Sequence, residues 1–122
     1  MSSIEGLRLL VAEDEALVSI LIEDMLAELG CSVVGAAASV PSALEIARNG
    51  RLDGAILDVN LGGESIDPVA QELAARAVPF LFVTGYGASG VPDQFAGTPV
   101  LQKPFQLPML KKALAELAWP RA

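Results

Sequence analysis

Short apolar runs of strand length recur along the chain, and stretches of helical composition separate them. The runs cover residues 7–12, 31–37, 53–57, 79–83 and 99–102. This alternation predicts an α/β fold, namely a doubly wound five-stranded parallel sheet with helices on both faces. The flavodoxin-like (βα)5 arrangement with strand order 2-1-3-4-5 is the common solution at this size, and its ligand crevice lies between the first and third strands.

The stretches between the runs carry recognisable helix boundaries. Gly30 follows the first helix as a C-terminal glycine, and Pro41 lies in the first turn of the second. Residues 88–97 are small, polar, glycine or proline, so any fourth helix there is expected to be short. The other expected helices cover 16–29, about 39–50, 66 or 68 to 76, and about 107–117.

The first helix is expected to have one buried and one exposed face. At about 100° per residue, the side chains expected in the core fall on one arc, and Ile20 falls roughly opposite. An exposed isoleucine is ordinary, although a small apolar patch here would also suit a partner helix. The core arc comprises Val18, Leu21, Ile22, Met25, Leu26 and Leu29.

Length and composition favour one domain. A chain of 122 residues leaves no room for a second catalytic or DNA-binding domain, so a single domain over 1–122 with a core of about 6–119 and no output domain is expected. Hydrophobic residues make up 52% and aromatic residues 5%, which suits buried strands covered by helices. The net charge of −7 argues against nucleic acid as a partner and favours a cation.

The chain contains no histidine, which excludes a phosphohistidine carrier, a Ser-His-Asp triad and a His-ligated zinc site. The single cysteine, Cys31, is expected to be a small buried residue. No run is long enough to span a membrane, and the N-terminal residues lack the features of a signal peptide. A soluble cytoplasmic protein without membrane contact is therefore expected.

Polar and charged side chains gather where the predicted strands end. Glu13 and Asp14 follow the first strand, Asp58 the third, Thr84 the fourth and Lys103 the fifth. The carboxyl ends of parallel strands meet at one edge of a sheet, so these residues are expected to share one site. Three neighbouring carboxylates repel each other unless their pKa values rise or a cation joins them. Oxygen ligands of this kind favour Mg²⁺, which also accepts phosphate oxygens.

These residues together suit phosphoryl transfer. Asp58 is the candidate nucleophile, and Lys103 with the Thr84 hydroxyl would hold the oxygens of the transferred group. Each residue alone also fits a structural role, such as a turn for Asp58 or a solvated charge for Lys103. Their coincidence at the ends of four strands favours a site.

Four sequence blocks resemble the signature blocks of response-regulator receiver domains. The resemblance implies that Asp58 is the phosphoacceptor. It also implies that Glu13, Asp14, Asp58 and the backbone carbonyl of Asn60 bind Mg²⁺. The blocks are Val11-Ala12-Glu13-Asp14-Glu15, Leu57-Asp58-Val59-Asn60-Leu61, Val83-Thr84-Gly85 and Lys103-Pro104-Phe105.

The same resemblance assigns a conformational switch and reveals one departure. Thr84 would bind the phosphoryl oxygens and carry the switch, and Lys103 would pair with the phosphorylated aspartate. Receivers usually have an aromatic residue three positions before this lysine, whereas this chain has Val100. The fourth strand and its loop instead resemble the receiver subgroup nicknamed FAT GUY, whose members lack that aromatic. We therefore expect Tyr86 and the segment 88–97 to form the bistable element.

The resemblance implies a signalling switch in a two-component system or phosphorelay. The phosphoryl donor would be a histidine kinase, of the HWE or a related type, or a histidine phosphotransfer protein. Leu17 and Ile20 are candidate kinase contacts. A downstream protein target is implied but not identified, and homodimerisation through the terminal helix is left open. No enzymatic activity is expected beyond the chain's own phosphorylation and dephosphorylation.

Other functions remain as alternatives at this point. A constitutive protein-docking scaffold would need none of the acids. A haloacid-dehalogenase-like phosphatase also uses a strand-end aspartate with Mg²⁺, but it needs an acid two residues later, where this chain has Asn60. A flavodoxin-like cofactor binder would have to hold a phosphate beside Glu13, Asp14 and Glu15, which repel it.

Overall fold

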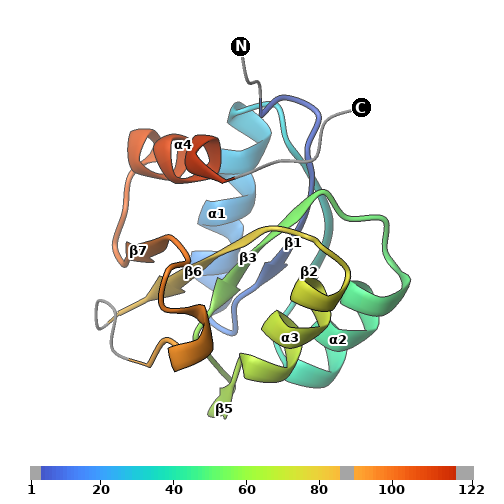
Figure 1. The fold of residues 1–122 in the computed structure, drawn as a ribbon. Coiled ribbons are helices and arrows are strands. Elements are labelled where there is room, and N and C mark those ends of the chain that lie inside the picture. The colour runs from blue at the N-terminus through green and yellow to red at the C-terminus, as the bar shows by residue number, and fades with distance from the viewer. Residues whose placement is uncertain (1–3, 86–89, 118–122) are drawn as a thin grey trace.

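A five-stranded parallel sheet forms the centre of the protein (Figure 1). The computed structural model describes residues 4–85 and 90–117. The strands are β1 (Arg8–Ala12), β2 (Ser32–Ala37), β3 (Gly54–Asp58), β6 (Phe80–Thr84) and β7 (Val100–Gln102). Their order is β2-β1-β3-β6-β7, and each neighbouring pair is parallel. The predicted strand order is therefore confirmed. The order in which the chain adds strands to the sheet reverses between β1 and β3, where the ligand crevice is predicted.

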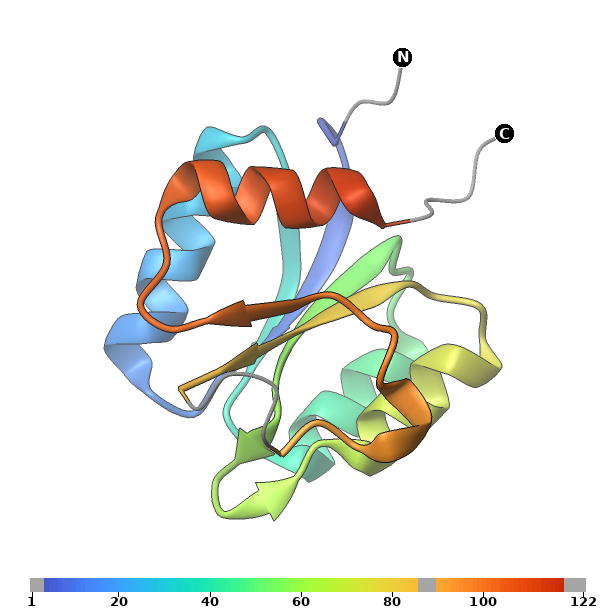
Figure 2. The same ribbon diagram turned by 60° about the vertical axis from the view of Figure 1, so that its left-hand side comes forward.

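Helices cover both faces of this sheet, as predicted. They are α1 (Ala16–Glu28), α2 (Val40–Asn49), α3 (Asp67–Ala75) and α4 (Leu107–Glu116). Figures 1 and 2 show α1 and α4 on one side of the sheet and α2 and α3 on the other. Within the described ranges, no helix combines the length and apolar character that crossing a membrane requires.

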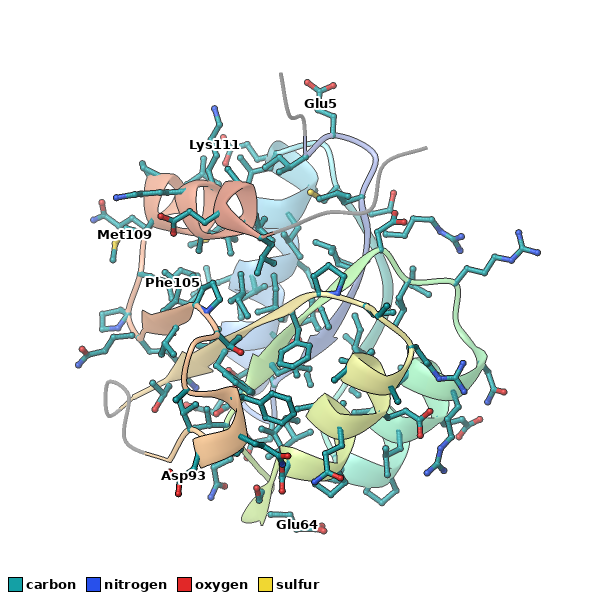
Figure 3. The ribbon with its side chains drawn as sticks, in the orientation of Figure 1. Glu5, Glu64, Asp93, Phe105, Met109 and Lys111 are labelled. Carbon is teal, nitrogen blue, oxygen red and sulfur yellow. The ribbon has the colours of Figure 1, made fainter. Side chains whose placement is uncertain are left out.

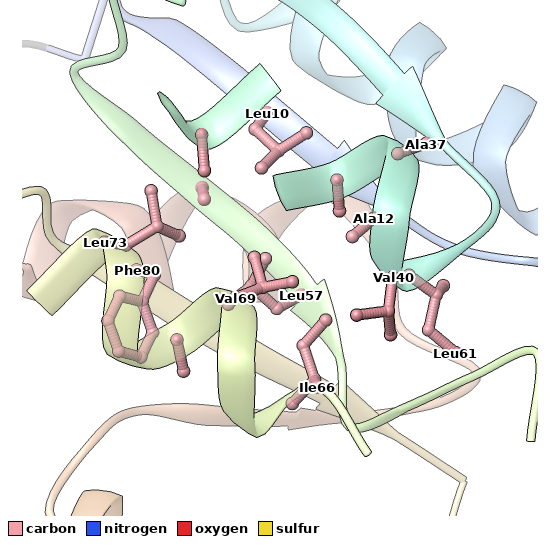
Figure 4. Packing of buried hydrophobic residues seen from close by; sticks show 14 of the residues in the cluster. Leu10, Ala12, Ala37, Val40, Leu57, Leu61, Ile66, Val69, Leu73 and Phe80 are labelled. Carbon is pink, nitrogen blue, oxygen red and sulfur yellow. The ribbon is translucent and has the colours of Figure 1, made fainter. Parts of the chain in front are cut away.

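Alternate residues of the central strands face the two helical layers. Leu9 and Val11 of β1 pack in the cluster that includes α1 and α4, whereas Leu10 and Ala12 belong to the cluster beneath α2 and α3. Figure 4 shows this second cluster from close by. Because helices cover both faces, β3 and β6 are buried along their whole length, and they read as continuous apolar runs.

The segment after β3 differs from its prediction. The sequence predicts a glycine-bearing loop, but the structure contains an antiparallel hairpin of β4 (Asn60–Leu61) and β5 (Glu64–Ser65). Gly62 and Gly63 form its turn with φ values of 61° and 84°. Left-handed values at both central residues are typical of tight hairpin turns. Strands of two residues are too short to show an alternating pattern, so the sequence did not predict them.

The segment after β6 contains less helix than a (βα)5 fold implies. Its described part has only the 3-10 helix η1 (Asp93–Phe95). The described chain therefore has four α-helices and one 3-10 turn instead of five α-helices. Glycine and proline near this turn disfavour a longer helix, as the composition of the segment predicts.

Helix α1 ends where its glycine predicts, but its buried face was predicted too broadly. Gly30 has a φ of 84°, and its N–H donates to the carbonyl of Ala27. Leu21, predicted in the core, is 56% exposed, so this prediction is wrong. The buried face is centred between Ile22 and Leu26, and Leu21 lies about 100° from Ile22. Ser19, on the opposite flank of that face, is buried instead.

Two smaller predictions are confirmed. Pro41 lies in the first turn of α2, as predicted, and the Ser39 hydroxyl oxygen caps this helix by accepting the Ser42 N–H. Cys31 is buried, and its thiol donates to the Ile4 carbonyl at 3.2 Å. Burial raises the pKa of the Cys31 thiol, so this cysteine has the character of a structural residue.

Candidate functional site

An open cleft of about 900 Å³ lies at the carboxyl edge of the sheet. Segments that follow β1, β3, β6 and β7 all contribute to its walls, as expected for a ligand site at this edge. Asp14, Asp58, Thr84 and Lys103 line it, so the structure brings the predicted residues together. The other lining residues are Glu15, Val18, Val59, Asn60, Ser65, Gly85, Gly90 and Pro104.

The Lys103 ammonium joins the acids of this cleft. Its Nζ atom donates to Asp58 Oδ2 at 3.0 Å and to Glu13 Oε1 at 3.0 Å. It also donates to Glu15 Oε1 at 3.2 Å. Lys103 is itself placed by the sheet, because its backbone N–H donates to the Thr84 carbonyl at 2.8 Å. One cation from the end of β7 therefore reaches acids from two other strand ends.

Asp58 lies at the buried end of β3, and its side chain is only 8% exposed. Lys103 bonds one of its carboxylate oxygens, and the other, Oδ1, accepts the Asn60 N–H at 3.1 Å. Both oxygens are thereby oriented, and the carboxylate faces the cleft. An oriented anionic oxygen beside a fixed cation is suited to nucleophilic attack on a phosphoryl group.

Glu13, Asp14 and Asp58 form a candidate metal site. One carboxylate oxygen of each lies within 4.8 Å of the others. Asp14 is placed further by the hairpin, because its Oδ2 accepts the Gly62 N–H at 3.0 Å. The donor set consists of hard oxygen atoms from carboxylates, which fits Mg²⁺ and does not fit soft metals. Asn60, the other predicted ligand, lines the same cleft.

The pKa values of two groups in the cleft, Glu13 and Lys103, are both raised. Burial raises the pKa of Glu13, and the nearby Asp58 charge raises it further, although hydrogen bonds from the Glu15 N–H and Lys103 oppose both. Burial lowers the pKa of Lys103, but its hydrogen bonds to Glu13 and Asp58 outweigh this, so its pKa lies above 10.5. Lys103 is therefore charged at neutral pH, whereas the raised pKa of Glu13 disfavours its charged form.

The residues predicted to form the switch are only partly described. Thr84 is 1% exposed at the end of β6 and lines the cleft. Val100, which stands where receivers usually have an aromatic residue, is half-buried in the cluster beneath α2 and α3. Tyr86 and residues 88–89 of the predicted switch segment lie outside the described residues. Phe95 of η1 packs edge-on against Phe80 and Phe82, with ring centroids 5.4 and 6.2 Å apart.

Sequence reasoning missed two contributors to the site. Glu15 was not among the predicted site residues, but its side chain accepts a hydrogen bond from Lys103 and makes no capping hydrogen bond. Gly62 lies in the segment predicted as a loop, and its N–H donates to Asp14. Neither role leaves a signal in the sequence, because both depend on contacts between residues that are 88 and 48 positions apart.

The fold and the residues of this cleft are typical of one protein family, and comparison with known families identifies the same one. The chain matches the response regulator receiver domain family over residues 9–115. It therefore belongs to that family, the receiver domains of two-component response regulators. Receiver domains bind Mg²⁺ in an acidic active site, and the acids of this cleft correspond to such a site.

Individual relatives are similar over most of this chain. The solution structure of SdrG from Sphingomonas melonis Fr1 is 46% identical, with a TM-score of 0.82, and the match covers 94% of this chain and 97% of that one. The transcriptional regulatory protein PdtaR of Mycobacterium tuberculosis is 33% identical over 118 residues, or 93% of this chain. That match covers 57% of PdtaR, so this chain spans little more than half of its relative's length.

A third relative has been solved with a metal ion. The receiver domain of the sensor histidine kinase PA1611 from Pseudomonas aeruginosa is 28% identical, with a TM-score of 0.78, and the match covers 89% of this chain and 94% of that one. Its structure contains a magnesium ion coordinated in the active site cleft. The oxygen donors gathered in the cleft of the present chain are of the kind that such an ion requires.

Proposed function

We propose that this receiver domain accepts a phosphoryl group on Asp58 and so acts as a signalling switch. The phosphoryl donor is a histidine kinase, of the HWE or a related type, or a histidine phosphotransfer protein. The observation that carries the proposal is the position of Asp58. Its carboxylate is oriented at the cleft between a cation, Lys103, and two further acids, Glu13 and Asp14.

The reaction is a transfer of one phosphoryl group between two proteins. An oxygen of the Asp58 carboxylate attacks phosphorus, a P–O bond forms, and the P–N bond of the donor phosphohistidine breaks. The electron pair of that bond stays on the imidazole nitrogen of the donor. Lys103 and the Thr84 hydroxyl would hold the phosphoryl oxygens, since both line the cleft beside Asp58.

Glu13, Asp14, Asp58 and the backbone carbonyl of Asn60 would hold Mg²⁺. When bound, the ion neutralises the charge that builds up where a carboxylate meets a phosphoryl group. The chain's own residues prepare this arrangement without it. The Gly62 N–H orients Asp14, the Asn60 N–H orients Asp58, and Lys103 links Glu13 to Asp58.

Signal output is proposed to depend on the segment after β6. Thr84 would move toward the phosphoryl group, and Tyr86 with the segment 88–97 would respond, as in the FAT GUY subgroup that the sequence resembles. Val100 leaves the usual position of the switch aromatic without a ring. In the described part of this segment, Phe95 supplies the aromatic packing.

Leu17 and Ile20 are proposed kinase contacts. Their side chains are 77% and 53% exposed on α1, which begins at the rim of the cleft. A downstream protein partner and a homodimer through α4 complete the proposed partners. Because phosphohistidine in kinases derives from ATP, the proposed reaction places the protein in the cytoplasm. Catalysis is proposed to be limited to the phosphorylation and dephosphorylation of Asp58 itself.

The test is the mass of the intact protein after incubation with acetyl phosphate and Mg²⁺. We expect one phosphoryl adduct that is labile to base and is not formed when EDTA removes the metal. The matched control is Asp58→Asn, which keeps the shape of the side chain and is expected to form no adduct. An adduct that persists in Asp58→Asn, or no adduct on the wild type, would contradict the proposed function and favour a constitutive docking scaffold.

A further inference from the structure

The three N–H groups of the Lys103 ammonium all have acceptors in the cleft. They donate to Glu13 Oε1, Asp58 Oδ2 and Glu15 Oε1 at 3.0, 3.0 and 3.2 Å. An ammonium group has three donors and no more. Lys103 can therefore hold a phosphoryl oxygen only if one of these three acceptors releases it.

The three acceptors differ strongly in their exposure to solvent. The side chains of Glu13 and Asp58 are 1% and 8% exposed, whereas that of Glu15 is 65% exposed. Glu13 is a buried carboxylate, which would keep an uncompensated charge if it lost Lys103, whereas the exposed Glu15 regains water. Of the two acceptors that remain carboxylates when Asp58 is phosphorylated, Glu15 therefore releases Lys103 at the lower cost.

Among the residues that the structure describes, the Glu15 side chain has no hydrogen-bond partner other than Lys103. Glu15 is the N-cap residue of α1, but its side chain makes no capping hydrogen bond. Glutamate is not among the residues favoured at this position. The Glu15 backbone N–H donates to Glu13 Oε2 at 3.0 Å, which fixes the residue beside the cleft and leaves its side chain directed to Lys103.

We propose that Glu15 is a placeholder acceptor, which holds the third N–H of Lys103 in the unphosphorylated protein and yields it to the phosphoryl group on Asp58. The hydrogen bond from Lys103 to Glu15 is exchanged for one from Lys103 to a phosphoryl oxygen, and no proton is transferred. The inference rests on the proposed function of Asp58. Glu15 is a positioning residue, because it acts through Lys103.

The placeholder opposes phosphorylation in two ways. Its hydrogen bond must break before the third N–H of Lys103 can bind the transferred group. Its negative charge, at the cleft wall, also repels an anionic phosphoryl donor. Removing the carboxylate is therefore expected to accelerate phosphorylation, which is the opposite of what loss of a supporting residue does.

The test compares phosphorylation rates of the full chain with acetyl phosphate and Mg²⁺, followed by intact mass. Glu15→Gln and Glu15→Ala are expected to react about two to five times faster than the wild type, the range set by an exposed ion pair. The control is Glu28→Gln, which removes the same charge from the far end of α1 and is expected to react at the wild-type rate. Affinity for beryllofluoride, a phosphoryl mimic, is expected to rise in the two Glu15 variants in the same proportion.

Each outcome decides between distinct conclusions. Glu15 variants that react at the wild-type rate or more slowly would overturn the placeholder role, and so would an equal acceleration in Glu28→Gln. A purely structural role for Glu15 predicts a lower melting temperature without faster phosphorylation or tighter beryllofluoride binding. If the wild type forms no adduct on Asp58 at all, the proposed function fails first and this inference fails with it.

Discussion

The loops that follow β3 and β6 border the same cleft, but different forces hold them. The hairpin after β3 is tied to the acids by hydrogen bonds, from Asn60 N–H to Asp58 and from Gly62 N–H to Asp14. The described part of the loop after β6 is held instead by the packing of Phe95 on Phe80 and Phe82.

The side-chain hydrogen bonds of the second loop add little to that packing. Gln94 donates to Asp67 Oδ1 at 2.8 Å, at an exposed position. Figure 3 shows Glu64 on the hairpin and Asp93 on η1 at the lower edge of the molecule. The hairpin is therefore joined by hydrogen bonds to two of the proposed metal ligands, whereas the hydrogen bonds that the structure describes for residues 90–97 do not reach these acids. This difference supports the proposal that the segment after β6 is the element that responds to phosphorylation.

The largest expected effect comes from the aromatic anchor of the second loop. Phe95→Ala should lower the free energy of unfolding by about 2 kcal/mol, less than for a fully buried phenylalanine because Phe95 is half-buried. Chemical denaturation measures this change, and Phe95→Leu is the matched control that should recover most of it. The rate of Asp58 phosphorylation by acetyl phosphate should stay close to that of the wild type. A large loss of that rate would show that the two loops are not independent.

A smaller effect is expected from the turn of the first loop. Gly62 has a φ of 61°, so Gly62→Ala should cost about 1 kcal/mol of unfolding free energy through backbone strain. Its added Cβ would lie 3.7 Å from the Ala38 carbonyl oxygen, which is an ordinary contact, so no steric clash adds to the cost.

The matched variant in the second loop is Gly97→Ala. A Cβ there meets nothing within 4 Å and no left-handed φ is required, so the change should be within about 0.5 kcal/mol. Thermal and chemical denaturation of both variants provide the comparison. Equal costs at the two glycines would contradict the view that only the hairpin depends on its precise backbone conformation.

The smallest effect is a pH dependence that originates from Glu13. Its pKa is higher in the folded protein than the 4.5 of an exposed glutamate, chiefly because of burial. Between these two values the folded state binds more protons than the unfolded state, so stability is lost as the pH rises. We therefore expect this group to lower the unfolding free energy as the pH rises above 4.5.

The measurement is the unfolding free energy in EDTA from pH 4 to pH 7, to keep Mg²⁺ from neutralising the acids. Glu13→Gln should gain stability relative to the wild type as the pH rises, because the glutamine does not ionise. Glu28→Gln is the control, since it removes a charge from the exposed end of α1. If the difference in unfolding free energy between Glu13→Gln and the wild type stays constant across this range, burial does not raise the pKa of Glu13.

Most of the fold was predictable because it depends on local patterns. Continuous apolar runs identified the five central strands, and Gly30 and Pro41 marked helix boundaries through their backbone preferences. The failures have local causes as well. Leu21 lies at the margin of a buried arc whose width the sequence does not specify, and the strands of the hairpin are too short to show a period.

By itself, the sequence determined which residues could meet, since Glu13, Asp14, Asp58, Thr84 and Lys103 each lie at or just beyond a predicted strand, and parallel strands share one edge. Only the tertiary structure decided how they meet. Whether Lys103 bonds two acids or three, and which N–H groups orient Asp14 and Asp58, depends on distances between segments far apart in the chain. A strand pattern is a local property set by side-chain burial, whereas a hydrogen bond requires two groups to be placed within about 3 Å of each other, and only the folded chain does that.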